Sequence, residues 1–417
     1  MLNRYIVFLF IFTTPDFASA ETKWRGESLP VNLTVGYAVL AIDLSGDGKL
    51  DIAIVDSKRF IWLENPTWKT HVMQATPEAA NDNVCFAPND IDADGHVDFA
   101  IGHDWQVNNT ASGGKIGWLK SPADPRGLWT YYPVAEQPTT HRMRWIDWNR
   151  DGKLDLVVAP LKGKNSQAPA FQDTAIPLLA FSPIADRATG PWPKTVIDES
   201  LHVSHNIDVV DMDGDGHAEL LAASFEGVTH LAPANSNSSG NSVQRSHLGA
   251  GQSGTAPAIG ASEIRLGRLA GNDRYLATIE PWHGNHVVVY TEPKANGTGN
   301  GNGKTLWDRH VLDAQLKWGH AVACANLDDD PEQELIIGVR DDLESNHRCG
   351  VRVYDRKTKT KTKTKTPAAE TWERQLLEPG QVAVEDLTVG DFDLDGDIDI
   401  VAVGRATHNA VIYWNEN

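Results

Sequence analysis

The residues best suited to chemistry form a run of alternating carboxylates, DFDLDGDID, at residues 391–399. Carboxylates stand at positions 1, 3, 5 and 9 of this nonamer (Asp391, Asp393, Asp395 and Asp399), and the glycine at position 6 permits a sharp turn. Oxygen ligands in this number and arrangement suit Ca²⁺. The glutamate that completes an EF-hand is absent, and the flanking residues are typical of strands. The run therefore predicts a calcium-binding turn between two strands.

The same nonamer recurs upstream at a near-regular interval. Successive copies start 47, 57, 64, 115 and 65 residues apart, and the interval of 115 corresponds to two periods. A degenerate copy within residues 262–278 keeps the strand pattern but has lost nearly all of its acidic ligands. Self-similarity at such a period indicates seven copies of one structural unit. The remaining predicted calcium ligands are Asp43, Asp47, Asp51, Asp90, Asp92, Asp94, Asp98, Asp147, Asn149, Asp151, Asp155, Asp211, Asp213, Asp215, Glu219, Asn326, Asp328, Asp330 and Glu334.

A second set of reactive side chains stands six residues before the first position of each nonamer. Equivalent positions of repeats related by a rotation axis form a ring, so three histidines and two glutamates are expected to converge from five consecutive repeats. Solvated strand ends are the alternative, but five metal- or proton-binding side chains in one register are improbable on that basis. The ring positions are Tyr37, Val84, His141, His205, His320 and Glu385, with Glu263 in the shorter fifth repeat.

Histidines and a glutamate around an open coordination position suit a catalytic Zn²⁺. The predicted zinc ligands are His141, His205, Glu263 and His320. Such an ion would polarise a substrate carbonyl and stabilise the negative charge that forms when a neighbouring carbon loses its proton, although the residues alone fit other metal-assisted reactions equally well.

The loops after the second strand of each repeat are expected to reach the same face as the ring. They hold His103 and His283, whose imidazoles titrate near neutral pH. We predict that His283, His103 and Glu385 act as acid–base groups, with no assignment between acid and base. The predicted substrate contacts are the two arginines, for hydroxyls or a carboxylate, and two aromatic residues: Arg142, Arg340, Trp282 and Tyr37.

Four short strands in each repeat must position these residues. In the first repeat they are expected at residues 39–42, 52–55, 59–63 and 68–72. Four antiparallel strands per repeat, arranged in a ring, form a β-propeller. In that fold the acidic loops occupy one face, the bottom, and the connections into each first strand surround a central funnel on the opposite face.

The last repeat ends at Asn417 after its third strand, whereas residues 24–29 match the outer-strand pattern. We therefore expect the N-terminal strand to complete the seventh blade, so that no sheet edge remains open. The predicted fold class is all-β, with a single seven-bladed propeller over residues 21–417 and calcium-binding loops on its bottom face.

Composition and the N-terminal segment bear on location and partners. The 417 residues are 41% hydrophobic, which is ample for a core, and the net charge of −19 argues against nucleic-acid binding. Residues 1–20 are typical of a secretory signal, with Arg4, an apolar run over 5–12 and small residues at 18–20. That run is too short to span a bilayer, and no other apolar segment approaches the length that spanning requires. We expect an exported protein, periplasmic or extracellular, without a transmembrane segment.

The repeats resemble the calcium-binding FG-GAP/VCBS propeller family, as in VGDF at residues 389–392 and the loop that follows. More narrowly, HRMRW at 141–145, HVSHNID at 202–208 and EPWHGNH at 280–286 are similar to the propeller part of the aldos-2-ulose dehydratase/isomerase family. That resemblance implies dehydration of keto sugars of the 1,5-anhydro-fructose type with a propeller-bound zinc. The fungal members carry cupin and lectin-like domains after the propeller, so the resemblance leaves the isomerase step open.

Three functions remain in view from the sequence. The leading one is an exported, metal-dependent dehydratase that eliminates water from a keto or anhydro sugar. A polysaccharide lyase acting on uronates is disfavoured, because the negative charge and the few top-loop arginines do not predict a basic groove. A non-enzymatic carbohydrate- or protein-binding calcium propeller stays open because Trp105, Trp282 and Trp318 can stack on sugars. The expected partners are a small sugar and a second copy or another protein covering the funnel.

Overall fold

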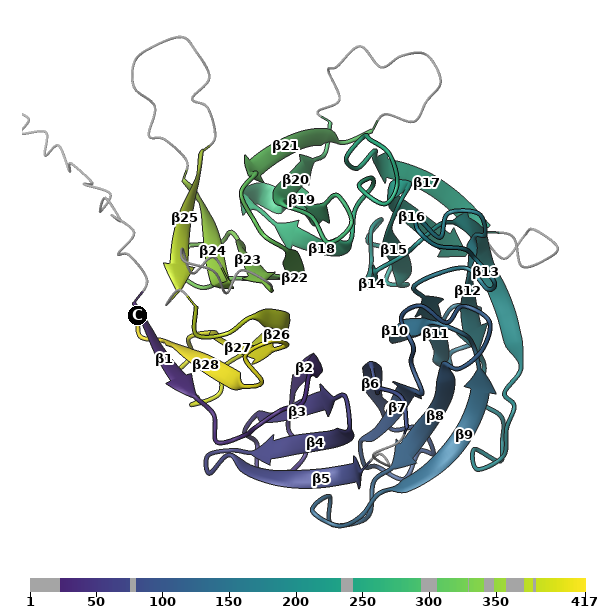
Figure 1. Cartoon of the computed structure of the whole chain (residues 1–417). Helices are drawn as coiled ribbons and strands as arrows, with labels where there is room; N and C mark the ends of the chain where they lie inside the picture. Colours follow the sequence, from purple (N-terminus) through teal and green to yellow (C-terminus); the bar gives the residue numbers. More distant parts are fainter. Residues whose placement is uncertain are drawn as a thin grey trace, which may run out of the picture.

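Seven four-stranded antiparallel sheets surround a central channel (Figure 1). The computed structural model describes residues 23–75, 80–233, 243–293, 306–328, 330–340, 349–357, 371–377 and 380–417. The predicted secretory signal at residues 1–20 lies outside these described residues. The predicted seven-bladed all-β architecture is confirmed, and one 3₁₀ turn, η1 (Ala270–Asn272), is the only helical element of the described chain.

The first strand of each sheet lines the channel. Each of these inner strands contacts the inner strands of both neighbouring sheets, so the ring closes on itself. The inner strands are β2 (Gly36–Ile42), β6 (Cys85–Asn89), β10 (Thr140–Ile146), β14 (Asn206–Val210), β18 (Glu263–Arg268), β22 (Gly319–Ala325) and β26 (Val384–Gly390).

The second and third strands form most of the core between neighbouring sheets. Short apolar runs bounded by turns predict strands that are buried on both faces, and the second strands are almost wholly buried. The second strands are β3 (Asp51–Asp56), β7 (Asp98–His103), β11 (Asp155–Pro160), β15 (Glu219–Ser224), β19 (Arg274–Glu280), β23 (Glu334–Val339) and β27 (Asp399–Gly404). The third strands are β4 (Arg59–Glu64), β8 (Lys115–Lys120), β12 (Ile176–Phe181), β16 (Gly227–Pro233), β20 (His286–Thr291), β24 (Gly350–Lys357) and β28 (Ala410–Asn415).

The fourth strands form the outer wall of the ring. A tryptophan at or just before most of these strands packs inward; Trp68, for example, contacts the rings of Phe392 and Trp414 in the seventh sheet. Such contacts join the outer part of one sheet to the next. The outer strands of the first six sheets are β5 (Lys69–Ala75), β9 (Thr130–Glu136), β13 (Lys194–Leu201), β17 (Val243–Gly249), β21 (Asp308–Asp313) and β25 (Thr371–Leu377).

The outer strand of the seventh sheet comes from the other end of the chain. β1 (Trp24–Ser28) pairs antiparallel with β28, with Trp24 opposite Asn415 and Ser28 opposite Val411. The Trp414 indole N–H donates to Glu27 over 2.9 Å. The two ends of the described chain therefore share one sheet, which is the position that the outer-strand pattern of residues 24–29 predicts.

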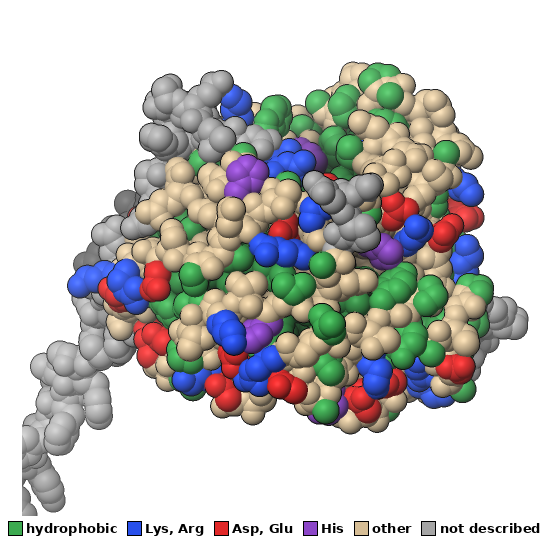
Figure 2. Space-filling view, turned by 60° about the horizontal axis from the view of Figure 1, so that its bottom comes forward, with side chains coloured by type: hydrophobic (Ala, Val, Ile, Leu, Met, Phe, Trp, Pro, Cys, Tyr) green, Lys and Arg blue, Asp and Glu red, His purple; other side chains and the backbone are tan. Residues whose placement is uncertain are grey.

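The surface shows no segregation of charge on the face in Figure 2, where acidic and basic side chains lie interspersed. The net charge of −19 is therefore not gathered into one acidic patch on that face. Among the described residues there is no helix that is long and apolar enough to cross a bilayer.

We predict that a variant lacking residues 1–28 melts several degrees below a variant lacking residues 1–22. Only the longer deletion removes β1, which leaves β28 as an edge strand with unpaired backbone groups and Trp414 without its Glu27 partner. Thermal unfolding followed by circular dichroism measures the difference. Equal melting temperatures would show that β1 contributes nothing to closure.

Candidate active site

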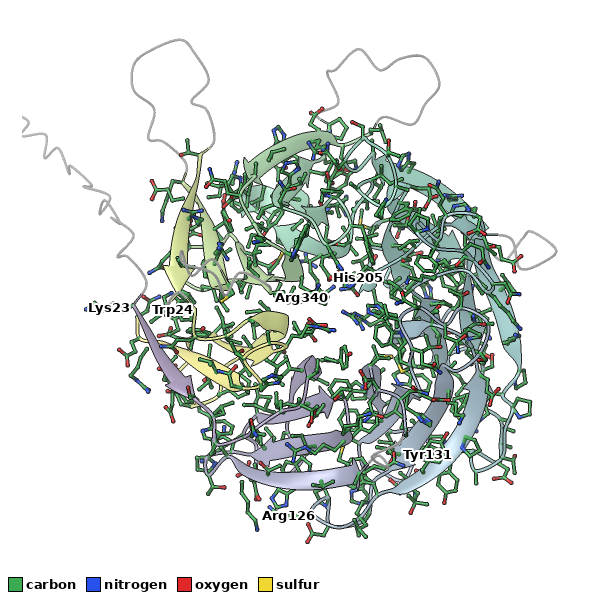
Figure 3. The ribbon with its side chains drawn as sticks, in the orientation of Figure 1. Lys23, Trp24, Arg126, Tyr131, His205 and Arg340 are labelled. Carbon is green, nitrogen blue, oxygen red and sulfur yellow. The ribbon has the colours of Figure 1, made fainter. Side chains whose placement is uncertain are left out.

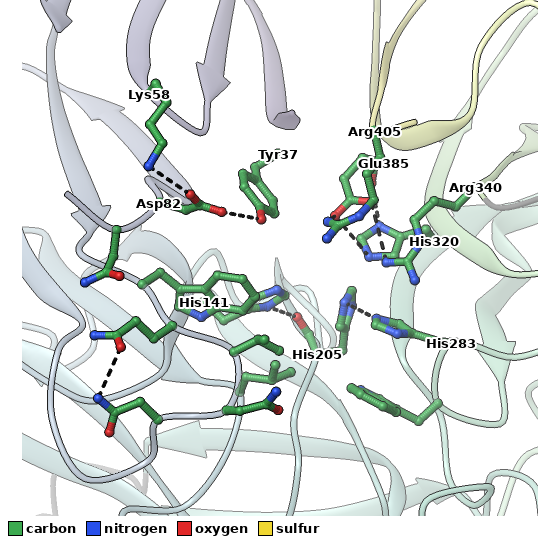
Figure 4. Close-up of a pocket in the computed structure, with 18 of the residues that line it drawn as sticks. Tyr37, Lys58, Asp82, His141, His205, His283, His320, Arg340, Glu385 and Arg405 are labelled. Carbon is green, nitrogen blue, oxygen red and sulfur yellow. Dashed lines mark hydrogen bonds and ion pairs between the residues drawn. The ribbon is translucent and has the colours of Figure 1, made fainter. Parts of the chain in front are cut away.

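A cavity of about 810 Å³ occupies the end of the channel opposite the acidic loops (Figure 4). Five of the seven ring positions predicted from the repeats line it, namely Tyr37, His141, His205, His320 and Glu385. The other two, Val84 and Glu263, are buried behind its wall. The rest of the lining comes mainly from connections into inner strands and from turns after second strands: Lys58, Ala80, Asn81, Asp82, Trp105, Gln106, Val107, Asn108, Asn109, Leu161, Trp282, His283, Arg340 and Arg405.

Three imidazoles converge at the floor of this cavity. His205, His283 and His320 each offer a ring nitrogen, and the three nitrogens lie within 4.8 Å of one another. Nε2 of His205 is 2.8 Å from Nε2 of His283, and the His205 and His320 ring centres are 4.7 Å apart. The three side chains come from different parts of the ring: the entry to β14, the turn after β19, and β22 itself.

Hydrogen bonds on the far side of two of these rings fix their tautomers. Nδ1 of His205 donates to the Glu263 carboxylate over 2.5 Å, and Nδ1 of His320 donates to the Glu385 carbonyl oxygen over 2.5 Å. A neutral imidazole that donates through Nδ1 keeps its lone pair on Nε2. Nε2 of His283 faces that lone pair on His205, so a proton or a cation must lie between them.

Glu263 supports His205 and does not join the group, which corrects its prediction as a zinc ligand. Its Oε1 accepts from His205 and its Oε2 accepts from the Asn206 side-chain amide over 2.5 Å. The residue is 2% exposed and does not line the cavity. Both carboxylate oxygens are thus taken up in orienting their neighbours. His283, predicted only as an acid–base group, stands with His205 and His320 instead.

His141 borders the group without entering it. Its Nδ1 donates to the His205 carbonyl oxygen over 3.0 Å, and its ring centre is 4.6 Å from that of His205. Its Nε2 lies 3.4 Å from the Arg142 guanidinium. His141 therefore lines the cavity and contacts His205, but its ring nitrogens are not among the three that converge.

Burial keeps these histidines neutral. It lowers the pKa of His141, His205, His283 and His320 well below the usual value. Arg142 lowers all four pKa values further, and Arg340 lowers those of His205, His283 and His320. Neutral imidazole is the form that binds a metal ion, because its lone pair is free. Burial therefore leaves the imidazoles in the form that can bind a cation, whereas the nearby arginines oppose added positive charge.

Glu385 stands beside His320 on the same wall. Its Oε1 accepts from Arg405 over 2.8 Å and lies 3.7 Å from Nε2 of His320, while its Oε2 is 3.5 Å from Arg340. Burial raises the pKa of Glu385, and the two arginines oppose that rise. This carboxylate therefore faces the point where the imidazoles meet and is held there by two guanidinium groups.

A second polar group occupies another wall of the cavity (Figure 4). The Tyr37 hydroxyl donates to Asp82 over 2.8 Å, and Lys58 is 3.4 Å from the other oxygen of Asp82. The Arg405 guanidinium lies over the Tyr37 ring, 5.4 Å from its centre, so it contacts both Tyr37 and Glu385. Burial raises the pKa of Tyr37, which keeps its hydroxyl protonated.

Sequence reasoning missed Lys58 and Asp82 as site residues, and it placed Arg405 on this face without giving it a role. Lys58 lies in the turn between β3 and β4, the same kind of turn that indicated His103 and His283, so its position could have been inferred. Asp82 lies in a connection whose length differs from repeat to repeat, and no periodic signal marks it.

A buried ion pair anchors the turn that carries Trp282 and His283. Glu280, at the end of β19, is fully buried and accepts from Arg309 over 2.8 and 2.6 Å and from the Tyr290 hydroxyl over 2.6 Å. His283 then adopts a left-handed backbone conformation with φ of 48°. A side chain on the next residue, Gly284, would meet the Glu280 carbonyl group at 2.2 Å, so the turn requires glycine there.

Backbone hydrogen bonds tie this turn to the other site elements. The Gly284 carbonyl accepts from Gly319 N–H over 2.9 Å, at the start of the strand that carries His320. The Trp282 N–H donates to the Ile259 carbonyl over 3.2 Å. The indole of Trp282 stacks on the His283 ring, with ring centres 4.2 Å apart. His283 is therefore held by both its backbone and its neighbour.

The structure places two other predicted residues outside the cavity. His103, at the end of β7, has its Nε2 3.0 Å from the hydroxyl of Tyr131, which lies at the periphery in Figure 3, while His205 and Arg340 lie at the channel. Arg142 is one residue beyond His141 and lines a second, lower cavity of about 490 Å³ in the channel. The structure therefore does not place His103 and Arg142 in the lining of the upper cavity, and their roles stay predictions. Arg340, Trp282 and Tyr37 do line the upper cavity.

The acidic loops lie between the first and second strands of their sheets, at the other end of the channel. Their position-1 carboxylates accept loop backbone N–H groups, as Asp43 does from Gly46 over 2.8 Å and Gly48 over 2.9 Å. The position-9 carboxylates tie the loop to the end of the third strand: Asp51 accepts from Leu44 and Asn65, each within 2.9 Å. These carboxylates therefore shape the loops as well as supplying oxygens.

Four loops bring carboxylates close enough to share a cation. The first group is Asp211, Asp213, Asp215 and Glu219; the others are Asp90, Asp92 and Asp94; Asp328, Asp330 and Asp355; and Asp391, Asp393 and Asp399. Asp355 comes from a third strand and was not expected from the nonamer. In the second sheet the Lys120 ammonium group contacts both Asp92 and Asp94, so a cation of the chain itself already neutralises part of that loop.

Comparison with known proteins identifies a related propeller. A family model described as aldos-2-ulose dehydratase, beta-propeller domain, matches residues 113–293. This stretch includes His141, His205, Glu263 and His283, whereas His320 and Glu385 lie beyond it. The aldos-2-ulose dehydratase of Phanerodontia chrysosporium is 28% identical over 260 residues, which is 58% of this chain but 28% of that protein. The chain thus has a propeller similar to that of a dehydratase and matches a small part of the relative's length.

Solved structures show the same architecture. BBS1N in its complex with ARL6DN is similar with a TM-score of 0.52 and 13% sequence identity, over 94% of this chain and 96% of that chain. A likeness at this level of identity shows the propeller fold alone.

We predict that Glu280→Gln lowers the free energy of unfolding by roughly 2–4 kcal/mol, because it leaves Arg309 without its buried carboxylate. The matched control is Arg25→Ala, which removes an exposed ion pair with Glu416 and should change stability by less than about 1 kcal/mol. Denaturant unfolding measures both variants. A loss in Glu280→Gln no larger than in the control would show that this pair does not anchor the turn.

Proposed function

We propose that this protein is an exported, metal-dependent sugar dehydratase that eliminates water from a keto or anhydro sugar such as 1,5-anhydro-fructose. The observation that carries the proposal is the convergence of three neutral imidazoles with Glu385 at the floor of a large cavity. The similarity to the propeller of a dehydratase selects elimination from the reactions that such a set could support.

The residues present fit a zinc ion. His205 and His320 donate through Nδ1 and keep their Nε2 lone pairs for a ligand, and Nε2 of His283 faces that of His205 at 2.8 Å. Three nitrogen donors with an open fourth position form the usual catalytic zinc set. We propose that His205, His283 and His320 hold Zn²⁺ and leave its fourth position open, with the Glu385 carboxylate beside the site. A bound Zn²⁺ supplies Lewis acidity toward a substrate oxygen.

Elimination also needs a group to accept the proton next to the carbonyl and a group to protonate the departing hydroxyl. We assign the first role to Glu385, whose carboxylate faces the cavity between Arg340 and Arg405. We assign the second role to Tyr37, whose hydroxyl remains protonated and is oriented by Asp82. The C–H electron pair becomes the new C=C bond, the C–O bond breaks, and the hydroxyl leaves as water with the Tyr37 proton. Arg405, which contacts both residues, balances the negative charge that Tyr37 acquires as Glu385 becomes neutral.

Trp105 and Trp282 favour a second candidate, a propeller that binds carbohydrate without converting it. Both line the cavity, and their buried indole N–H groups have no protein partner among the described residues. An unpaired buried donor is costly unless a ligand accepts from it. Both candidates therefore predict a sugar in the cavity, and turnover distinguishes them.

We also propose that the acidic loops bind Ca²⁺ and that the ion stabilises the ring. Burial raises the pKa of the position-9 carboxyls Asp98 and Asp399 to about 6, and repulsion from the other loop carboxylates adds to that rise. A cation favours the charged form of these groups and is bound by the folded state only, so it adds to stability.

We predict about one zinc ion per chain in the wild type and none in His205→Ala/His320→Ala, both kept in excess Ca²⁺. Dehydration of 1,5-anhydro-fructose, followed through the ultraviolet absorbance of the unsaturated product, should fall to background in the double variant. The matched control is His247→Ala/His310→Ala, which removes two exposed histidines of outer strands and should keep both zinc and activity. Zinc without turnover would favour the binding propeller, and no zinc in the wild type would exclude the metal enzyme.

We predict that EGTA lowers the melting temperature of the wild type and that added Ca²⁺ restores it. Asp391→Asn/Asp393→Asn, which changes one of the four carboxylate groups, should respond less to EGTA than Asp47→Asn, which lies in a loop without such a group among the described residues. Differential scanning fluorimetry measures these shifts. A melting temperature that does not respond to chelation would rule out a structural role for calcium.

A further inference from the structure

A further cavity of about 950 Å³ opens beside the candidate active site, next to the fifth sheet. Its walls include Pro257, Pro281, Leu316 and Trp318, and we call it the annex. Trp282, His283 and Arg340 line both the annex and the upper cavity. The stacked pair of Trp282 and His283 therefore stands between the two spaces, so one ligand can contact both.

Trp318 is the distinctive residue of the annex. It is 45% exposed, although exposing a large indole to water is unfavourable. Its backbone is nevertheless held: the Trp318 carbonyl accepts from Arg340 N–H over 2.9 Å, and the next residue donates to Gly284 over 2.9 Å. These bonds join Trp318 to both the Arg340 and the His283 segments. An exposed aromatic side chain on a backbone that is held beside the candidate active site is suited to receive a ligand.

The annex combines flat apolar surfaces with polar side chains. Trp318, Pro257 and Pro281 offer the apolar surfaces, while Asn285 and Gln315 lie at the same cavity and can hydrogen-bond. A pyranose ring has this same division, because its C–H groups form apolar faces and its hydroxyls project from the edge. A purely apolar ligand would gain nothing from the polar side chains, and a nucleic acid is disfavoured by the net charge of −19.

We propose that the annex binds a second sugar ring, joined by a glycosidic bond to the ring that is dehydrated. The substrate class is then a keto disaccharide or longer glycoside, with one ring at the imidazole group and the next on Trp318. This inference rests on the proposed function for the position of the first ring. The two cavities share His283 and Arg340 in their lining, and this adjacency is the observation that links the two rings.

The volumes support the same substrate class. Sites for whole drug-sized ligands usually measure roughly 300–1,000 Å³. The upper cavity, at about 810 Å³, and the annex, at about 950 Å³, each reach the upper part of that range. A single keto monosaccharide would therefore leave most of this space to water.

The test separates binding from turnover by using sugars that cannot be dehydrated. Glucose, maltose and cellobiose are titrated into the wild type, Trp318→Ala and Trp318→Phe by isothermal titration calorimetry. In the wild type at least one disaccharide should bind roughly tenfold more tightly than glucose. Trp318→Ala should lose this preference without weakening glucose binding, and Trp318→Phe should retain part of it. The matched control is Leu128→Ala, an exposed residue that lines neither cavity, which should behave as the wild type.

Two outcomes would overturn the annex proposal. The first is a wild type that binds disaccharides no more tightly than glucose, and the second is a preference that survives in Trp318→Ala. A protein or peptide occupant of the annex would give the first result.

Comparing these titrations with the dehydration assay on the wild type makes the failure of the two proposals distinguishable. A disaccharide preference without any dehydration in the wild type would remove the proposed reaction and leave the annex standing. Dehydration of a keto monosaccharide without that preference would do the reverse.

Discussion

A sheet of this propeller can bury its faces only against the neighbouring sheets, so the chain is stable only as a closed ring. Closure forces the seven inner strands to share one axis, and equivalent positions of the repeats then point toward the same place. The candidate site follows from this geometry, because Tyr37, His141, His205, His320 and Glu385 occupy one position of the repeat and line one cavity. Closure of the ring is by itself enough to bring these five side chains together.

Ring closure does not set the direction in which each side chain presents its reactive atom. A layer of buried hydrogen bonds sets that direction. Glu263 orients His205, the Glu385 backbone orients His320, and the Glu280–Arg309 pair holds the turn with His283. Apart from the partly exposed Arg309, these groups are buried, so each of them would carry a large desolvation cost if left unpaired. The same burial keeps the imidazoles neutral, and neutral imidazoles are what a cation needs. The burial of polar groups that are almost all hydrogen-bonded therefore has two effects. It holds the side chains in place, and it keeps the imidazoles neutral for a cation.

The sequence was sufficient for the architecture and for the ring position, because both are periodic and repeat six or seven times. Prediction from the sequence failed for those features of the site that do not repeat along the chain. Glu263 has the predicted register, yet pairing with His205 and Asn206 removes it from the cavity. Arg142 follows His141 directly, but the register of the strand shifts between Thr140 and Arg142, and Arg142 lines the lower cavity. His103 contacts Tyr131 of an outer strand, a partner that no pattern within its own loop reveals. Asp82 and Trp318 lie in connections whose lengths vary among repeats, so only the folded structure shows where they stand.

The pairing of β1 with β28 has a mechanical consequence. The two ends of the described chain lie side by side in one sheet and are joined by a short antiparallel ladder, from Trp24–Asn415 to Ser28–Val411. Any pull or chance opening that separates the ends must first break that ladder, and the six other sheets lose their cyclic support only afterwards. The force at which the ring begins to open is therefore set by the strength of this β1–β28 ladder and not by that of the average sheet. A cut in a connection between two other sheets leaves the β1–β28 pairing intact. The ring should therefore tolerate a break in the chain there better than the loss of the five residues of β1.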